Sequence, residues 1–172
     1  MTVVVVLLSV VILAFGAGAI FGAPWVPAFN QDLDELFDLA KLKRGSKFVD
    51  LGCGDGKILL AAARRGAIVT GYEINPIMWA IAWLRLRQYR SHANVYFGSY
   101  WSHNLTSYDV IWLYLIDHHM PRMAQKIHSQ ASAKAHIISY IFEFPNIRPF
   151  KRTRNSFIYR GKDFMSLSDQ IQ

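Results

Sequence analysis

The sequence has a single cysteine, Cys53, among its 172 residues. One cysteine cannot form an intrachain disulfide, and it excludes a zinc site built from several cysteines. Acidic side chains are also few, since 12 Asp and Glu stand against 19 Lys and Arg, giving a net charge of +7. This excess suits an anionic partner such as nucleic acid, an acidic protein or an anionic lipid. The basic residues are dispersed, however, so a solvated basic face explains them equally well.

Charged side chains are absent from Val3 to Ala23, where Ser9 supplies the only polar side chain. A helix of that length spans about 31 Å, which is close to the thickness of a bilayer's hydrocarbon core. We therefore predict one N-terminal transmembrane helix at residues 1–23, followed by a second domain at residues 24–172. The length of that second part fits one domain with its own core.

The flanking charges bear on whether the apolar segment is kept. Ala17-Gly18-Ala19 resembles a processing site, so a cleaved signal peptide is the alternative. No Lys or Arg precedes the apolar run, however, whereas Lys41, Lys43 and Arg44 follow it. This asymmetry favours an uncleaved, single-pass membrane anchor. It also favours a cytosolic location for the following domain, or a matrix-facing one if the protein is mitochondrial.

Three glycines at alternate positions, Gly52, Gly54 and Gly56, join a predicted buried strand to a predicted helix. The strand covers Lys47 to Leu51, and the helix begins at Lys57. Glycine allows a sharp backbone turn and lets a ligand approach closely, and the amides at the helix N-terminus face that ligand. The pattern therefore indicates a small-molecule site at this strand end.

An acidic residue ends the next predicted strand. The apolar run from Ile68 ends in Glu73, where a carboxylate can accept both hydroxyls of a ribose. A dinucleotide fingerprint would need a third glycine at Lys57, and the loop instead has the form D-x-G-x-G-x-G starting at Asp50. These residues resemble motif I of the Rossmann-like class I S-adenosylmethionine-dependent methyltransferases. The resemblance implies S-adenosylmethionine as the cofactor.

Strands and helices are expected to alternate over most of the chain. The further strands are expected at residues 95–98, 109–115 and 135–142, and the further helices at 33–44, 76–90 and 120–129. This alternation predicts an α/β fold with a mostly parallel sheet and helices on both faces. Ser156–Arg160 and Phe164–Leu167 are expected to form a final hairpin or to extend the sheet edge.

In an open parallel sheet, a ligand binds outside the carboxyl ends of the strands. The residues expected to hold the cofactor are Asp50, Gly52, Gly54, Asp55, Gly56, Glu73, Asn75, Ser99 and Tyr100. The acceptor pocket is expected to be lined by Trp101, Tyr140 and Phe142. Aromatic walls of this kind attract a sulfonium or a lysine ammonium. The candidate catalytic residues are Tyr114 and Asp117, although aromatic core packing explains Tyr114 equally well.

Two further features have competing explanations. His118-His119 suggests a metal site, but no matching ligand cluster accompanies the pair, so no metal is expected. The helix at 76–90 is apolar on more than one face and carries Arg85, Arg87 and Arg90. It is either a core helix with a basic end or a helix that touches the membrane surface or the anchor.

The chain resembles one small family more closely. Its segments PWVPAF, FVDLGCGDGKILLAAARRGA, GYEINP, DVIWLYL and SYIFEFPNIRP, behind an apolar N-terminus, are similar to the membrane-anchored protein-lysine methyltransferases. That family includes the enzymes that act on the ATP synthase c-subunit and the adenine nucleotide translocase, with prokaryotic relatives. The resemblance covers Pro24 to Pro149 and implies methyl transfer to a lysine ε-amine of a membrane protein. Asp117 stands where the family has proline, and Asn146-Ile147 where it has Gly-Trp.

Other acceptors remain open at this point. A lipid or quinone methyltransferase fits the anchor and the apolar pocket equally well. A nucleic-acid methyltransferase would use the positive charge, but the fourth strand ends in Leu115-Ile116-Asp117-His118, which lacks an Asn/Asp-Pro-Pro-Tyr motif. Nucleic acid is therefore not expected as a partner. A membrane-tethered protein that binds S-adenosylmethionine without turnover is the non-enzymatic alternative.

Overall fold

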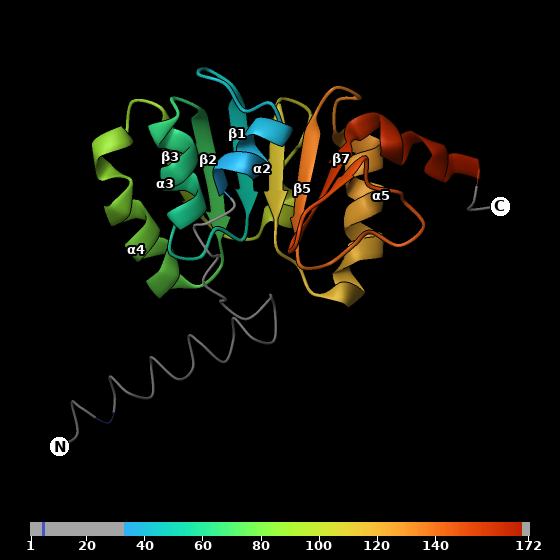
Figure 1. Cartoon of the computed structure of the whole chain (residues 1–172). Helices are drawn as coiled ribbons and strands as arrows, with labels where there is room; N and C mark the ends of the chain where they lie inside the picture. The colour runs from blue at the N-terminus through green and yellow to red at the C-terminus, as the bar shows by residue number, and fades with distance from the viewer. Residues whose placement is uncertain (1–4, 6–32, 170–172) are drawn as a thin grey trace.

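The computed structural model describes Val5 and residues 33–169 (Figure 1). Apart from Val5, the predicted anchor at residues 1–23 lies outside the described residues. Among those that are described, no helix is both long enough and apolar enough to cross a membrane. The anchor therefore stays a prediction.

A single sheet of seven strands forms the centre of the domain, in the order β3-β2-β1-β4-β5-β7-β6. Its strands are β1 Lys47–Leu51, β2 Ile68–Glu73, β3 Ala93–Phe97, β4 Val110–Leu113, β5 His136–Tyr140, β6 Lys151–Arg152 and β7 Ser156–Arg160. The first five strands are parallel, and β7 pairs antiparallel with both β5 and β6. The predicted α/β fold with a mostly parallel sheet is therefore confirmed.

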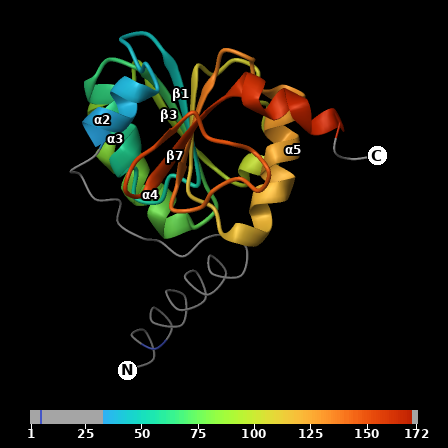
Figure 2. The ribbon, with the colours of Figure 1, turned by 45° about the vertical axis from the view of Figure 1, so that its right-hand side comes forward.

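Helices cover both faces of this sheet, as the alternation predicts. The helices are α2 Leu33–Leu39, α3 Lys57–Arg64, α4 Pro76–Arg85 and α5 Met120–Gln130. Figure 2 shows α2 and α3 on one side of the strands and α5 on the other. Each face of the sheet has its own hydrophobic core, and β1 contributes to both. Phe48 packs with residues of α2 and α3, whereas Val49 packs with residues of α5. Such alternation is the normal consequence of the strand pleat.

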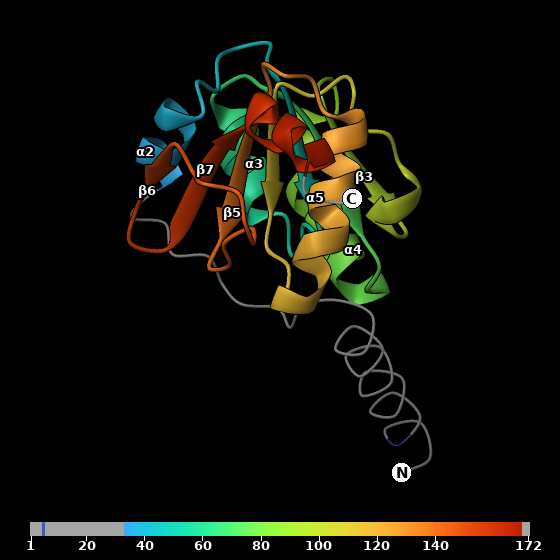
Figure 3. The same cartoon turned by 90° about the vertical axis from the view of Figure 1, so that its right-hand side faces the viewer.

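Three expectations are wrong. The helix expected at residues 33–44 ends at Leu39, five residues early. The helix starting at Pro76 ends at Arg85 rather than at Arg90, and the short 3-10 turn η2 (Arg87–Tyr89) follows it. Phe164–Leu167 does not form a strand, because it belongs to the 3-10 segment η5 (Gly161–Asp169), which lies against α5 (Figure 3).

The final hairpin pairs β7 with β6 instead of with the later segment. Phe164 is fully buried, and its ring lies 4.9 Å from the ring of Phe144 and 5.6 Å from that of Tyr159. Its carbonyl also lies 2.9 Å from Nδ1 of His128 on α5. Burial of this ring against α5 therefore prevents an extended sheet edge at this position.

Candidate cofactor and acceptor site

The strand register brings the predicted site residues to one edge of the sheet. Leu51 of β1 pairs with Tyr72 of β2 on one side and with Leu113 of β4 on the other. Because these strands and β5 are parallel, the residues that follow these positions lie side by side. In order across the sheet they are Glu73, Gly52, Tyr114 and Tyr140.

The glycine loop after β1 has two different reasons for glycine. Gly52 and Gly56 both have left-handed backbones, with φ of 93° and 78°. A Cβ built on Gly52 would meet nothing within 4 Å, whereas one on Gly56 would lie 2.9 Å from the Cβ of Ala82. Gly52 therefore leaves open space at the strand end, while Gly56 lets the loop pack directly on α4.

The carboxylate of Glu73 fixes the other wall of the loop. Its Oε2 accepts a hydrogen bond from the Gly54 amide at 2.8 Å, and its Oε1 accepts one from the Asn75 amide at 2.7 Å. The side-chain oxygen of Asn75 in turn accepts from the amides of Ile77 and Met78, which caps α4. These bonds hold the carboxylate in one position beside the glycine loop.

Three carboxyl groups gather around the loop. Burial raises the pKa of Asp50 well above its ordinary value, and the neighbouring Glu73 and Asp55 raise it further. Asp55 is held by α4, because its Oδ2 lies 2.6 Å from Nη1 of Arg85. Burial also raises the pKa of the Cys53 thiol, so this cysteine is a small loop residue and not a nucleophile. A cationic ligand beside Asp50 would favour the ionised form of this carboxyl group, so the site suits positive charge.

The segment after β3 is attached to α5. It contains the short turn η3 (Tyr100–Ser102), which starts where Ser99 Oγ accepts from the Trp101 amide. The ammonium of Lys126 on α5 donates to the carbonyl oxygens of Trp101 and His103, at 3.1 Å and 2.6 Å. Burial raises the pKa of Tyr100 to about 12, and the negative charge of Glu73 adds to the shift. The Ser99–Trp101 segment is therefore held in place on the Glu73 side of the site.

An aromatic cluster follows β4 and β5. The ring of Tyr114 lies 5.9 Å from that of Tyr140, edge to face, and 6.2 Å from that of Phe142, stacked. Burial raises the pKa of the Tyr114 phenol, and Tyr140 contributes to the shift. The phenol therefore stays protonated at neutral pH and can donate a hydrogen bond.

A strained turn shapes this aromatic cluster. Ile141, between Tyr140 and Phe142, has a φ of 70°, which is rare for a β-branched residue. The Phe142 amide donates to the carbonyl oxygen of Tyr140 at 2.9 Å across this turn. Strain of this kind is concentrated at functional sites in proteins. No sequence signal at Ile141 predicts it.

Two of the expected acceptor-side residues lie outside the cluster. Trp101 is expected to share a pocket with Tyr140 and Phe142, but its ring instead contacts Tyr100, His119 and the guanidinium of Arg122, which lies 4.2 Å from the ring centre. Asp117 is exposed and begins the 3-10 turn η4 (Asp117–His119). In residues 33–169, no group of His, Cys, Asp and Glu side chains that could hold a metal includes this turn.

Comparison with known proteins decides the family. Residues 50–151 match the protein family described as the ANTKMT methyltransferase domain, which is more than half of the chain. The chain belongs to this family. Over 130 residues it is 30% identical to the human lysine N-methyltransferase named for the ATP synthase c-subunit, aligning 73% of this chain with 54% of that one. It is also 24% identical to the "Protein-lysine N-methyltransferase" of Saccharolobus islandicus, covering 73% of this chain and 81% of that one.

The chain spans about half the length of the human relative. Among solved structures, it is similar to an RNA methyltransferase from Salinibacter ruber in complex with S-adenosyl-L-homocysteine. The TM-score is 0.72 at 24% identity, over 78% of this chain and 92% of that one. This likeness confirms the class I Rossmann-like fold, and with membership of a methyltransferase family it confirms S-adenosylmethionine as the cofactor.

The loop of this ANTKMT-family domain fits that cofactor on two observations. The open space beside Gly52 leaves room at the strand end for a ligand. The carboxyl group of Asp50 suits a positively charged group of the ligand, and that of Glu73, fixed by two backbone amides, suits the hydroxyls of a ribose.

Three residues help to position this site, and the sequence analysis does not predict a role for any of them there. Arg85 pairs with Asp55 from thirty positions away, and Lys126 holds the η3 segment. Gly71 of β2 lets Leu59 and Cys53 approach, because a Cβ there would lie 2.3 Å from Cδ1 of Leu59. The only sequence signal among them is a glycine inside a strand, which often marks close packing.

Proposed function

We propose that this chain transfers the methyl group of S-adenosylmethionine to a lysine ε-amine of a membrane protein. The observation that carries the proposal is the register at the switch between β1 and β4. It places the open glycine position Gly52 beside Tyr114 and the aromatic cluster. In open α/β sheets, ligands bind at such a point, where the strand order reverses.

On this proposal, the donor side consists of the glycine loop and its carboxylates. Glu73 would accept the ribose hydroxyls, and Asp50 would face the positive charge of the methionine part. Ser99 and Tyr100 would border the adenine, as expected from the sequence. S-adenosylmethionine supplies an electrophilic methyl group bound to a sulfonium. Every other contribution comes from how the protein holds the two reactants.

The acceptor side would be the aromatic cluster of Tyr114, Tyr140 and Phe142. Aromatic faces attract an ammonium group, and burial among them lowers the pKa of a lysine amine by desolvation. The phenol of Tyr114, which stays protonated, would orient the amine rather than act as the base. Rate enhancement would then come mainly from proximity and orientation.

The membrane part of the proposal has separate support. Residues 3–23 carry no charge, and a domain attached to an anchor searches for its substrate in the membrane plane, which raises effective concentration. The human relative is named for the ATP synthase c-subunit, which is a membrane protein. We propose a single-pass location with the domain in the cytosol, or facing the matrix if the protein is mitochondrial.

A labelling experiment tests this function. The full chain is incubated with methyl-tritiated S-adenosylmethionine and membranes, protein is separated from lipid, and the protein is hydrolysed to identify methyl-lysine. We expect label on lysine. Label in the lipid fraction alone would establish a lipid or quinone methyltransferase instead. Cofactor binding with no label in either fraction would establish a binding protein without turnover.

A matched pair of variants tests the aromatic cluster. Tyr114→Ala should lower lysine labelling at least about tenfold, as for a lost orienting contact, with the dissociation constant of S-adenosylmethionine unchanged. Phe150→Ala is the control, because this ring lies beside His136 at the opposite end of β5. Equal losses in the two variants would argue against the cluster as the acceptor site.

The anchor is tested by deletion of residues 1–23. We expect loss of labelling in membranes, while binding of S-adenosylmethionine and unfolding temperature stay unchanged. Full labelling of membranes by the shortened chain would contradict the anchor.

A further inference from the structure

Residues 74–108 contain no Asp or Glu, although they make up one fifth of the sequence. The segment includes α4, the edge strand β3 and the turn η3, and it carries three arginines and eight aromatic residues. Figure 1 shows α4 and β3 together at one end of the sheet, far from α5. This segment is therefore rich in arginine and aromatic rings and contributes no acidic side chain of its own, although Arg85 pairs with Asp55 of the glycine loop.

The apolar side chains of α4 are unusually exposed. Of its ten residues only Ala82 is buried, while Ile81, Trp83 and Leu84 are 38%, 43% and 54% exposed. The neighbouring β3 adds Phe97, which is 58% exposed. Scattered single apolar residues are normal on a surface, but a continuous group of them marks an interaction site.

Two arginines lie next to this apolar group without an acidic partner. Four ion pairs join acidic and basic side chains in residues 33–169, and neither Arg87 nor Arg90 takes part. Arg90 lies over the ring of Trp83, with its Cζ 4.4 Å from the ring centre. Both arginines are exposed, so their charge is available to an anion.

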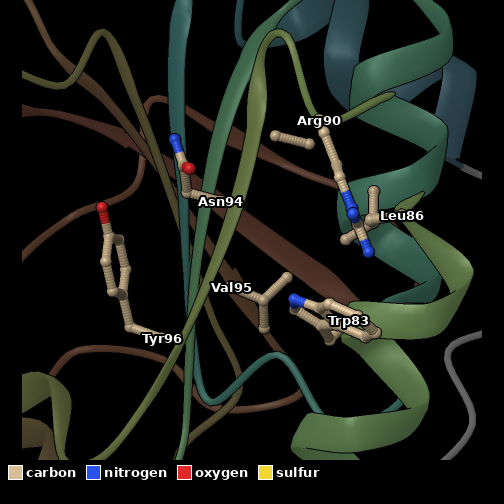
Figure 4. A pocket seen from close by; sticks show the side chains of 7 residues that line it. Trp83, Leu86, Arg90, Asn94, Val95 and Tyr96 are labelled. Atoms are coloured by element: carbon tan, nitrogen blue, oxygen red, sulfur yellow. The ribbon is translucent and has the colours of Figure 1, made fainter. Parts of the chain in front are cut away.

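A surface groove of about 350 Å³ lies at the same place (Figure 4). Trp83 of α4, with Leu86 and Arg90 after it, lies on one side, and Val95 of β3 faces them; Figure 4 shows the side chains of Asn94 and Tyr96 pointing to the other side of β3. Its lining therefore mixes apolar side chains with polar groups, among them one guanidinium. It also lies along the free edge of the sheet, and not at the strand ends that hold the glycine loop.

We propose that this surface, made of Ile81, Trp83, Leu84, Arg87 and Arg90, binds the headgroup region of an anionic phospholipid bilayer. We call it the α4–β3 surface, because these residues belong to α4 and the turn after it and lie beside the edge strand β3. Arginines bind lipid phosphates, and exposed Trp, Leu and Ile side chains enter the boundary between headgroups and acyl chains. The chain's own apolar segment at residues 3–23 is a poorer occupant, because it carries no charge to pair with the arginines.

This inference goes beyond the proposed function, since it concerns how the domain lies on the bilayer and not what it methylates. It can hold whether the acceptor is a protein lysine or another group. A docked α4 would fix the domain relative to the bilayer, because α4 is joined to the glycine loop through Ala82 and Arg85.

Site-directed quenching tests the proposal on the full chain. A cysteine introduced by Leu84→Cys carries an environment-sensitive fluorophore, and Gln125→Cys on α5 serves as the matched exposed control. Native Cys53 is buried and gives the background. Each protein is reconstituted into nanodiscs that contain headgroup-level spin-labelled lipid. The discs hold phosphatidylcholine alone or phosphatidylcholine with phosphatidylglycerol at about 7:3.

We expect quenching at position 84 to exceed that at position 125 at least about threefold in anionic discs, and to fall in neutral discs and at high salt. The double change Arg87→Gln with Arg90→Gln should weaken docking several-fold. The change Lys151→Gln with Lys162→Gln removes the same charge from exposed positions elsewhere and should leave the quenching unchanged.

Equal quenching at the two positions would overturn the proposal, as would a loss that is equal for the arginine and lysine pairs. Nucleic acid is the other polyanion that suits arginine and aromatic side chains. A single-stranded RNA oligonucleotide that shifts the fluorescence at position 84, together with anionic discs that do not, would assign the surface to nucleic acid instead.

Discussion

The glycine loop and the α4–β3 surface are neighbours in the sequence but opposite in charge. The loop region places the carboxyl groups of Asp50, Asp55 and Glu73 together, and the next 35 residues contain no carboxylate. The acids at the loop are largely buried, whereas Arg87 and Arg90 are exposed. On the two proposals, one region suits a cationic ligand in a defined place, and the other suits a broad anionic surface.

Because the two regions differ in burial, their charged side chains are expected to affect the stability of the domain differently. Burying an ionised carboxylate destabilises the folded protein until a ligand or a proton neutralises its charge. Exposed arginines are solvated and have little effect on folding. Substitutions at the loop should therefore change stability and cofactor affinity together, whereas those at the α4–β3 surface should change only binding to membranes.

The largest effect is expected where the loop touches α4. Gly56→Ala combines a left-handed backbone with a Cβ 2.9 Å from that of Ala82, and should destabilise the domain by about 3 kcal/mol. For a domain of this size the unfolding temperature would fall by about 6–12 °C. The measurement is thermal unfolding followed by circular dichroism.

Gly52→Ala is the matched variant, because it has the same backbone strain without the clash. It should destabilise the domain by only about 1–2 kcal/mol but weaken binding of S-adenosylmethionine at least about tenfold. Equal unfolding temperatures for the two variants would show that packing on α4 does not distinguish the two glycines.

The next effect concerns the buried charge of Asp50. Asp50→Asn should raise the free energy of unfolding of the ligand-free domain at pH 8 by about 1 kcal/mol. The unfolding temperature would then rise by about 2–4 °C. It should also weaken binding of S-adenosylmethionine about tenfold, since a charge-assisted contact is lost. Calorimetric titration and thermal unfolding measure the two changes.

The pH dependence of the wild type and of Asp50→Asn follows from the direction of the Asp50 pKa shift. The pKa of Asp50 is raised in the folded protein, so the folded state keeps this proton to higher pH than the unfolded state. Its contribution to stability therefore falls as pH rises from about 3.9, its unfolded value, to its folded pKa, and is constant above that. Cofactor affinity should rise over the same interval in the wild type and be flatter in the variant. Parallel pH profiles would remove Asp50 from the cofactor site.

Local signals were sufficient for the strands, loop and helix that surround the candidate cofactor site. The strand that contains Asp50, the glycines and the acid at Glu73 are all specified within 27 residues, from Lys47 to Glu73, by apolar runs and by turn chemistry. Parallel pairing then follows from the alternation of strands and helices. For this reason the predicted β1, loop, α3 and β2 agree with the structure almost residue by residue.

The acceptor half depends on long-range packing that leaves no local pattern. The turn at Ile141 is held by its neighbours in space, and a β-branched residue gives no hint of a positive φ. Trp101 is drawn toward α5 by Lys126 and Arg122, which are more than twenty positions away. The strand β6 has only two residues, both exposed, so it shows no alternation that could reveal it.

The smallest effect tests the one ion pair that joins the two regions. Arg85 on α4 and Asp55 in the loop are partly buried, so a double-mutant cycle with Arg85→Gln and Asp55→Asn should give a coupling of about 1 kcal/mol in unfolding free energy. Each single change should also weaken S-adenosylmethionine binding by about two- to fivefold, because the loop loses its attachment.

Arg65 and Asp38 form the control pair, since they are joined at 2.6 Å but connect the end of α3 to α2, where Arg65 also pairs with Asp34. That cycle should give a similar or smaller coupling in stability with no change in cofactor affinity. If both cycles leave cofactor affinity unchanged, the loop is positioned by Gly56 and Ala82 alone, and the charge contrast between the regions plays no part in holding the cofactor.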